Sequence, residues 1–312
     1  MLLYDLYKAV EQFGTIPCRS VGGLIDNMQG SQIRQRLHEG LPVVGSHVAS
    51  YMNPTLATMV AEVPFDFVFI CTEHIPLDRT EVGNMCRHYT ARGISPIVRV
   101  PSPDKTAIAM HLDAGAEGIV VPYVETVQEV LDAVGAVHYR PVKGEILDSF
   151  LRDQHPLPGD TAEFCKKFNS EKYLIIGIES VPAIHRLEEL ISVPGVDGVF
   201  LGPHDITVSM GIPEQYTHPR FVDAVEAVIL KCRKQGIGVG IHYRLADLGE
   251  ETLRRYLDAG MNWLLNASDV TIMRDAMKKD FEILRNVTGA SGVLGLLPSA
   301  KNGSEPAKSC IG

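Results

Sequence analysis

The chain lacks the glycine-rich signatures of nucleotide-binding proteins. Neither a GxGxxG turn nor a GxxxxGK[ST] loop occurs among its 312 residues. Because such loops cradle a dinucleotide or a triphosphate, their absence counts against both a dinucleotide-binding doubly wound sheet and a P-loop enzyme. Any chemistry of this chain therefore has to be sought in other side chains.

Runs of positive charge and long apolar runs are also missing. The formal net charge is -9 at pH 7, and no Lys/Arg run would favour a nucleic acid or an anionic membrane surface. No apolar stretch is long enough to cross a bilayer, and the first residues lack the features of a secretory signal. We expect no nucleic-acid partner and no membrane partner.

Cysteine pairs at metal-binding or redox spacing are absent too. The six cysteines are scattered along the chain, and no CxxC motif occurs. This usage fits reduced thiols better than a disulfide framework. We therefore expect a cytoplasmic protein.

What the sequence does contain is a repeated alternation of short β-branched runs and helix-like segments. Most intervals have the length of one strand, one helix and two loops. Eight such units favour an α/β protein with a parallel (β/α)8 TIM barrel, whereas the alternative, an open doubly wound sheet, normally uses fewer strands. The strand-like runs begin near Val43, Asp66, Ser95, Gly118, Tyr173, Asp197, Ile237 and Asn262.

The helix-like segments carry typical end signals. Gly115 and Gly260 each follow a helix and precede a strand, which is the usual C-terminal stop. Pro182 lies near a helix start, and Ser31 has the side chain of an N-cap. The expected helices are Pro54 to Val63, Arg79 to Arg92, Lys105 to Ala114, Thr126 to Val137, Val181 to Ile191, Arg220 to Gln235 and Gly249 to Ala259.

The repeat also sets the expected domain boundaries. Residues 1–30 form an N-terminal extension, residues 31–288 form the barrel as a single domain, and residues 289–312, rich in Gly, Ser and Ala, form a flexible tail. One long interval, residues 137–172, interrupts the repeat. We expect it at the strand-end rim, where long excursions are usually lids or subunit contacts.

Two acidic residues follow consecutive strand-like runs. Glu179 comes directly after the run that ends at Ile178, and Asp205 follows the run that ends at Leu201. Since the carboxyl ends of parallel strands meet at one rim, these carboxylates suit a Mg²⁺- or Mn²⁺-like ion with positions left for substrate. The structural alternative is that Glu179 pairs with a basic side chain and Asp205 caps a helix.

Arg99 lies inside an apolar strand-like run. An unpaired arginine is rarely buried, so a structural role would pair it with Glu179, Glu73 or Asp205. A functional role would be an anion clamp for a carboxylate or a developing enolate. The two roles are compatible, because a carboxylate-rich rim would hold the guanidinium when no substrate is bound.

Histidines occur at several strand ends. His74 is a candidate general base near neutral pH, with a capping or hydrogen-bonding role as the alternative. His47 and His242 are weaker candidates for such a catalytic role. The N–H groups of His204 and Asp205, at the start of a helix-like segment, could bind a substrate carboxylate.

Five segments follow one another in a specific order and spacing. They are Ile70 to Pro76, Pro96 to Pro101, Leu112 to Ala116, Ile178 to Ser180 and Gly198 to Ile206. Together they resemble the HpcH/HpaI family of metal-dependent, class II pyruvate aldolases, and the resemblance spans roughly residues 33–284.

The resemblance implies a barrel that assembles as a homo-oligomer, often through an exchanged C-terminal helix. It implies that Glu179 and Asp205 hold Mg²⁺, Mn²⁺ or Co²⁺, which pyruvate chelates through its carboxylate and keto oxygens. Arg99 would stabilise the enolate, His74 would take part in proton transfer with the aldehyde, and Asp113 would reach a neighbouring subunit's site. The implied substrate-binding positions are Arg99, Gly202, Pro203, His204 and Asp113.

The chain departs from the family pattern on the acceptor side. The family usually carries Asp-Gly where Cys71 and Thr72 stand here, and a thiol cannot orient an imidazole as a carboxylate does. His204 replaces a small residue, Asn266 replaces a typical Gly, and the family's Pro-Pro-x-Gly-x-Arg-Gly loop is represented only by residues 140–145. We expect an intact enolate half of the site and a remodelled acceptor half.

Three interpretations of the function follow. The first is a carbon–carbon lyase that cleaves or makes a 4-hydroxy-2-oxo acid from a pyruvate enolate. The second is a related enolate enzyme with another electrophile, such as a synthase or an oxaloacetate decarboxylase. The third is a barrel that has lost its chemistry and acts as a binding protein, against which the retention of Arg99, Glu179 and Asp205 argues.

Overall fold

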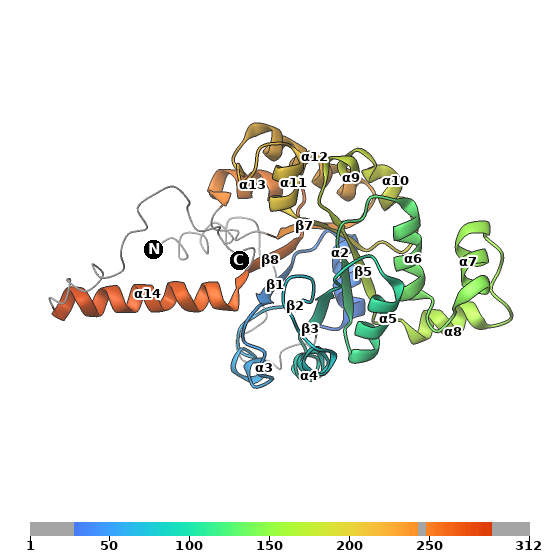
Figure 1. Ribbon diagram of the computed structural model, residues 1–312, viewed down its shortest axis with the longest axis horizontal. Helices are drawn as coiled ribbons and strands as arrows, with labels where there is room; N and C mark the ends of the chain where they lie inside the picture. The colour runs from blue at the N-terminus through green and yellow to red at the C-terminus, as the bar shows by residue number, and fades with distance from the viewer. Residues whose placement is uncertain (1–27, 243–247, 289–312) are drawn as a thin grey trace.

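Eight parallel strands form a closed barrel in which each strand pairs with the next, and the last pairs with the first. The computed structural model describes residues 28–242 and 248–288. The predicted TIM barrel is confirmed, and each strand begins within one residue of its expected start (Figure 1). The strands are β1 (Val43–Val48), β2 (Phe67–Cys71), β3 (Ser95–Arg99), β4 (Gly118–Val121), β5 (Tyr173–Ile178), β6 (Gly198–Leu201), β7 (Gly238–His242) and β8 (Trp263–Ser268).

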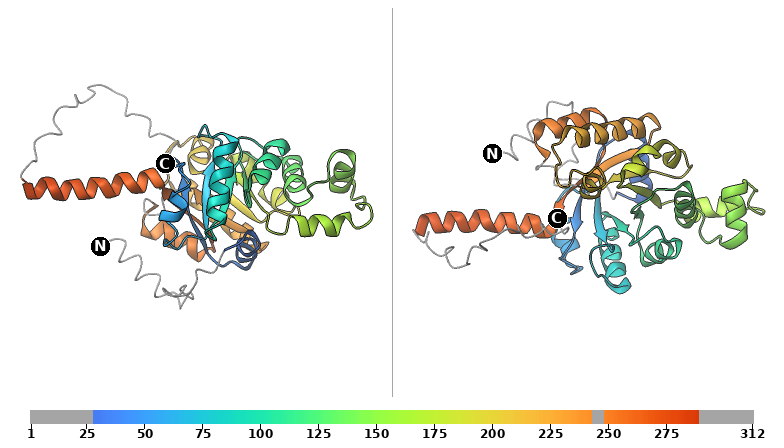
Figure 2. Two further views of the ribbon diagram at one scale, coloured as in Figure 1. Left: turned by 90° about the horizontal axis from the view of Figure 1, so that it is seen from below. Right: turned by 45° about the horizontal axis from the view of Figure 1, so that its top comes forward.

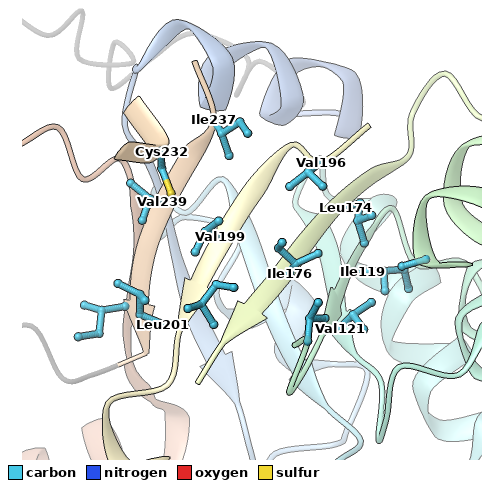
Figure 3. Close-up of a cluster of buried hydrophobic side chains, with 14 of the residues drawn as sticks. Ile119, Val121, Leu174, Ile176, Val196, Val199, Leu201, Cys232, Ile237 and Val239 are labelled. Carbon is cyan, nitrogen blue, oxygen red and sulfur yellow. The ribbon is translucent and has the colours of Figure 1, made fainter. Parts of the chain in front are cut away.

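The strands are apolar on both faces because both faces are buried. Successive side chains alternate, so Phe67 and Phe69 fill the barrel interior, while Val68 and Ile70 pack outward. The outward side chains form a continuous layer between the strands and the helices, part of which Figure 3 shows on β4 to β7. These two core layers, one inside the barrel and one between the strands and the helices, fix where each strand ends. They thereby also fix the positions of the polar side chains that follow the strands.

Helices alternate with the strands largely as expected. The described helices before the long interval are α2 (Gly30–Glu39), α3 (Leu56–Met59), α4 (Arg79–Thr90), α5 (Lys105–Ala114) and α6 (Val127–His138). Those within and after it are α7 (Gly144–Asp153), α8 (Thr161–Phe168), α9 (Val181–His185), α10 (Leu187–Ile191), α11 (Pro203–Ser209), α12 (Pro219–Lys234), α13 (Glu250–Asp258) and α14 (Asp269–Thr288).

Three helix predictions need correction. The segment expected from Pro54 to Val63 is helical only in α3. The segment expected from Val181 to Ile191 divides at Arg186, whose backbone (φ -94°, ψ 5°) leaves the helical region and separates α9 from α10. Ser31 is not an N-cap, because Gln29 caps α2 while the Ser31 hydroxyl and N–H both donate to Glu171.

The ends of the chain lie mostly outside the described residues. The expected extension is described only from residue 28, where Met28 is buried and Gly30 begins α2. The expected tail over residues 289–312 is not described. Residues 31–288 remain our proposal for the barrel domain.

The long interval lies at the opposite end of the barrel from the predicted rim. It follows α6 and precedes β5, so α7 and α8 sit where strands begin. Lys172 donates to the carbonyl of Ala116, just before β4, and a ring nitrogen of His138 contacts the carbonyl of Gly195, just before β6. The predicted position at the strand-end rim was therefore wrong, because a segment between a helix and the next strand belongs to the amino-terminal end.

The last described helix, α14, projects away from the barrel on the side opposite α7 and α8 (Figure 2). Only Thr271 of its twenty residues is buried. No described helix is both long enough and apolar enough to cross a membrane.

Candidate active site at the carboxyl ends of the strands

An aromatic floor closes the barrel interior beneath the strand ends. Phe69 from β2 stacks with Phe200 from β6 at a ring-centroid distance of 6.1 Å, and Trp263 from β8 meets both rings edge-on. The Arg99 guanidinium stands 5.5 Å from the centroids of both Phe69 and Phe200. The floor thus supports a cation on an apolar surface that excludes water.

Arg99 is buried and held by partners from β2 and the turn beyond it. Its Nε lies 2.9 Å from the Glu73 carboxylate, and its Nη2 donates to the Cys71 sulfur at 3.1 Å. Burial alone would lower the pKa of Arg99, but the Cys71 sulfur and the Glu73 and Glu179 carboxylates outweigh it and raise the pKa. The guanidinium is therefore permanently charged. Of the three structural partners considered for it, Glu73 is the one with which it forms an ion pair.

Glu179 and Asp205 converge on the same point. A Cβ placed on Gly202 would lie 3.1 Å from the Glu179 carboxyl carbon and 3.4 Å from an Asp205 oxygen. Glu179 follows β5 and is 2% exposed, whereas Asp205 lies in the first turn of α11 and is partly exposed. A Cβ at this position would crowd the Glu179 carboxylate, so glycine at position 202 leaves it more room beside Asp205.

The electrostatics around Glu179 and Asp205 favour a bound cation. Glu179 Oε1 is buried without a hydrogen-bond partner among the described residues. Burial raises the pKa of Glu179 to about 8; Arg99 opposes this shift, whereas the nearby Glu73 and Asp205 carboxylates reinforce it. Three carboxylates thus face one guanidinium, and hard oxygens of this kind are the ligands that Mg²⁺ and Mn²⁺ prefer.

The residues present fit a divalent ion held by two protein ligands. Within the described ranges, no group of three or more His, Cys, Asp and Glu side chains is arranged to hold a metal. Mg²⁺ is commonly bound by one or two carboxylates, with substrate and water completing its shell. Glu179 and Asp205 match that donor set.

Tyr123, at the end of β4, contacts both carboxylates. Its hydroxyl donates to Asp205 at 3.3 Å, and its backbone N–H interacts with the Glu179 carboxylate and lowers the pKa of Glu179. Its φ of 53° is in the left-handed region, which is uncommon for a residue other than glycine and is found at functional sites. Tyr123 was not among the predicted site residues, because its residue type alone gives no reason to single it out.

His74 lies beside the charged cluster. Its Nε2 is 3.7 Å from a Glu73 oxygen, and its backbone N–H donates to the Cys71 sulfur at 3.4 Å. Burial and the Arg99 charge lower the pKa of His74, which favours a neutral imidazole. The hydrogen bonds of the Cys71 sulfur go to Arg99 and to the backbone of His74, and none within the described residues joins it to the His74 ring.

The structure does not bring Asp113 into this cluster. Asp113 ends α5 at the amino-terminal end of the barrel, where its exposed carboxylate pairs with Arg140 at 3.0 Å. Gly202 and Pro203 lie where β6 passes into α11, next to the carboxylates, and His204 follows them in the first turn of α11. Within one chain, the predicted site residue Asp113 therefore lies away from the cluster around Glu179 and Asp205.

Comparisons with known proteins agree with this architecture. The sequence profile of the HpcH/HpaI aldolase/citrate lyase family matches residues 48–275. A hydroxypyruvate/pyruvate aldolase of Sagittula stellata is 31% identical over 73% of this chain and 87% of its own. A 4-hydroxy-2-oxo-heptane-1,7-dioate aldolase of Salmonella paratyphi C is 28% identical over 83% of this chain and 98% of its own. A crystal structure of an HpcH/HpaI aldolase from Desulfitobacterium hafniense superposes with a TM-score of 0.69 at 26% identity, covering 81% of this chain and 96% of that one.

Proposed function

The chain belongs to the HpcH/HpaI aldolase/citrate lyase family, and we propose that it is a metal-dependent aldolase acting through a pyruvate enolate. In this proposal it makes or cleaves the carbon–carbon bond of a 4-hydroxy-2-oxo acid. The observation that carries the proposal is the convergence of Glu179 and Asp205 on Gly202, with the buried Oε1 of Glu179 left unpaired among the described residues.

Glu179 and Asp205 would hold the divalent ion, which we take to be Mg²⁺, Mn²⁺ or Co²⁺. The chemistry that such an ion supplies is Lewis-acid polarisation of a chelating oxo acid. Tyr123 keeps the Asp205 carboxylate in place through its hydroxyl. Glycine at position 202 leaves room for the Glu179 carboxylate close to Asp205.

Arg99 would stabilise the enolate oxygen. Its guanidinium is already fixed by Glu73, Cys71 and the aromatic floor, so it needs no reorganisation when negative charge develops. Preorganised donors of this kind commonly contribute a hundredfold or more in rate, roughly. Arg99 is therefore the proposed catalytic group for enolate formation.

His74 would move a proton on the acceptor side. A depressed pKa keeps the ring able to accept a proton near neutral pH. The backbone N–H groups of His204 and Asp205, at the start of α11, would bind the substrate carboxylate, with Gly202 and Pro203 forming the turn beside it.

The test is exchange of pyruvate methyl protons into D₂O, which reports enolate formation without a second substrate. We expect exchange that requires Mn²⁺ or Mg²⁺ and that falls at least about a hundredfold in Glu179→Gln. Glu163→Gln, an exposed substitution on α8, is the matched control. Mn²⁺ should also raise the thermal midpoint of the wild type but not of Glu179→Gln, because a ligand that binds the native state stabilises it.

The outcomes separate the three interpretations. Exchange with cleavage of 4-hydroxy-2-oxo acids supports the aldolase, and exchange with activity only on oxaloacetate favours a decarboxylase. Exchange that is absent from the wild type, or unchanged in Glu179→Gln, would remove the enzyme hypothesis in favour of a binding protein.

We further propose that the protein is a homo-oligomer of the cytoplasm. Helix α14 exposes a stripe of apolar side chains that a second copy would cover, and an assembly could bring Asp113 of one copy to the site of another. The four cysteines within the described residues are all free and buried, as reduced compartments favour.

A further inference from the structure

Two histidine rings lie against each other at the barrel mouth. His47 lies near the end of β1 and His242 ends β7, and their ring centroids are 5.2 Å apart. His47 is 3% exposed, yet neither of its ring nitrogens has a hydrogen-bond partner among the described residues. Buried polar groups are nearly always hydrogen-bonded, so this one points to a missing ligand.

Other histidines of the chain show what a structural role looks like here. His111, similarly buried, bonds the carbonyl of Ala107, and His38 and His138 both bond backbone carbonyls and contact Asp197. His47 has no such hydrogen bond within the described ranges and instead meets the rings of Phe69 and His242 edge-on. These ring contacts leave both nitrogens of His47 without the hydrogen bonds that these other histidines make.

The pair shares the aromatic floor with Arg99. His47 stands 5.2 Å from Phe69, and His242 stands 5.3 Å from Phe69 and 5.6 Å from Phe200. These are the two rings over which the guanidinium also lies, at 5.5 Å. The imidazoles thus line the same mouth as the enolate-stabilising group, on its β1–β7 side.

A second metal site is a poor explanation for the pair. No third His, Cys, Asp or Glu joins them in a metal-like arrangement within the described part of the chain. Burial lowers the pKa of His47 to about 4, and burial and the Arg99 charge lower the pKa of His242 well below its usual value. Both rings are thus neutral, each with one N–H donor and one nitrogen acceptor.

We propose that His47 and His242 form the acceptor subsite of the aldolase and bind a hydroxyl group of the acceptor aldehyde. A hydroxyl donates one hydrogen bond and accepts others, so it complements a neutral imidazole on each side. A carboxylate would satisfy only the donors, and an alkyl chain would satisfy neither. This inference rests on the proposed function and names its second substrate as a hydroxyaldehyde.

The test compares acceptors that differ only in a hydroxyl replaced by a methyl. Glycolaldehyde against propanal, and 3-hydroxypropanal against butanal, are such pairs, and kcat/KM is measured for each with pyruvate. We expect the wild type to prefer a hydroxyl-bearing member by about tenfold or more, the size of a hydrogen bond in a desolvated site. Because the preference is a ratio within one enzyme, a uniformly damaged variant leaves it unchanged.

The variants are His47→Phe and His242→Leu, with His47→Gln as the conservative substitution and His88→Phe on exposed α4 as the control. Loss of the preference in the first two, its partial recovery in His47→Gln and its retention in His88→Phe would support the subsite. An unchanged preference in His47→Phe and His242→Leu would overturn it, as would a wild type that favours glyoxylate over every hydroxyaldehyde.

Proton exchange of pyruvate alone separates this proposal from the one it rests on. If the wild type does not exchange, the aldolase function itself fails and the subsite fails with it. If exchange is metal-dependent but the hydroxyl preference is absent, only the assignment of His47 and His242 is overturned.

Discussion

Tyr123 shows how one residue can organise a site that two other residues define. Its backbone lies in a region that costs about 1–3 kcal/mol for a side chain of this kind, and in return its hydroxyl reaches Asp205 while its N–H faces Glu179. Burial and the surrounding carboxylates raise the pKa of its hydroxyl, so the group remains a donor across the usual pH range.

We expect Tyr123→Phe to weaken Mn²⁺ binding by about tenfold, because partners that orient metal ligands typically contribute that much. Titration calorimetry of Mn²⁺ in the absence of substrate measures it. Tyr256→Phe is the control, since the buried Tyr256 hydroxyl on α13 has no hydrogen-bond partner in the described part of the chain. Equal Mn²⁺ affinity in wild type and Tyr123→Phe would show that the hydroxyl contact does not position Asp205.

For single residues, the sequence predicts which side chains reach the site but not which groups they contact there. Glu179, Asp205 and Arg99 could be found because each stands at or just beyond a strand end, and strand ends follow from hydrophobic pattern. The pairing of Arg99 with Cys71 depends on the register between β2 and β3, which sets Cys71 opposite Arg99. The role of Tyr123 depends on a backbone conformation that its residue type does not favour.

Among the elements, α2 is tied to the barrel through a buried carboxylate. Asp197, just before β6, accepts from the N–H of Leu174 at 2.8 Å and contacts His38 of α2 at 2.9 Å. Burial alone would raise the pKa of Asp197, but hydrogen bonds from His138 and His38 lower it. The Asp197 hydrogen bond raises the pKa of His38 against burial and the charge of Arg34.

This tie predicts a pH-dependent stability contribution from His38. A raised pKa in the folded state stabilises the protein fully below the unfolded value of about 6.5 and loses that stabilisation as pH rises through the folded pKa. His38 is 44% exposed, so solvent screening limits the effect to about 1 kcal/mol or less. The thermal midpoint of His38→Gln should fall below the wild type by up to about 2–4 °C at pH 6 and by less at pH 9. A gap that is constant from pH 6 to pH 9 would contradict it.

Helix predictions succeeded where glycine marks a helix end and failed where connectivity or a backbone turn decides the position. Segments with glycine stops, such as the one before Gly115, had the right ends because a left-handed residue terminates the helix. The position of α7 and α8 was mispredicted because length suggested a lid, whereas connectivity after a helix dictates the amino-terminal end. The division at Arg186 had no signal in composition, since it arises from the backbone turn between two short packed helices.

For the whole molecule, α14 is the feature that the barrel alone does not account for. Met273, Met277, Phe281 and Leu284 follow one another at helical spacing and are 42–57% exposed. Hydrophobic periodicity predicted a helix-bearing barrel, but periodicity cannot say whether an apolar stripe packs on its own chain or on another. A projecting helix of this length gains little stability from propensity alone and depends on packing of its apolar face.

We therefore expect a second copy of the chain to cover this stripe, and Phe281→Glu combined with Leu284→Lys to convert an oligomer into a monomer. Burying a charge in an apolar interface is strongly unfavourable without a partner, so the assembly should dissociate. Light scattering coupled to size exclusion measures the mass, and Lys278→Glu, a charge change at an exposed position of the same helix, should leave it unchanged. A wild type that is monomeric, or a double variant of unchanged mass, would rule out α14 as the contact between copies. If dissociation also slows aldol cleavage while proton exchange of pyruvate persists, the neighbouring copy contributes to the acceptor half of the site.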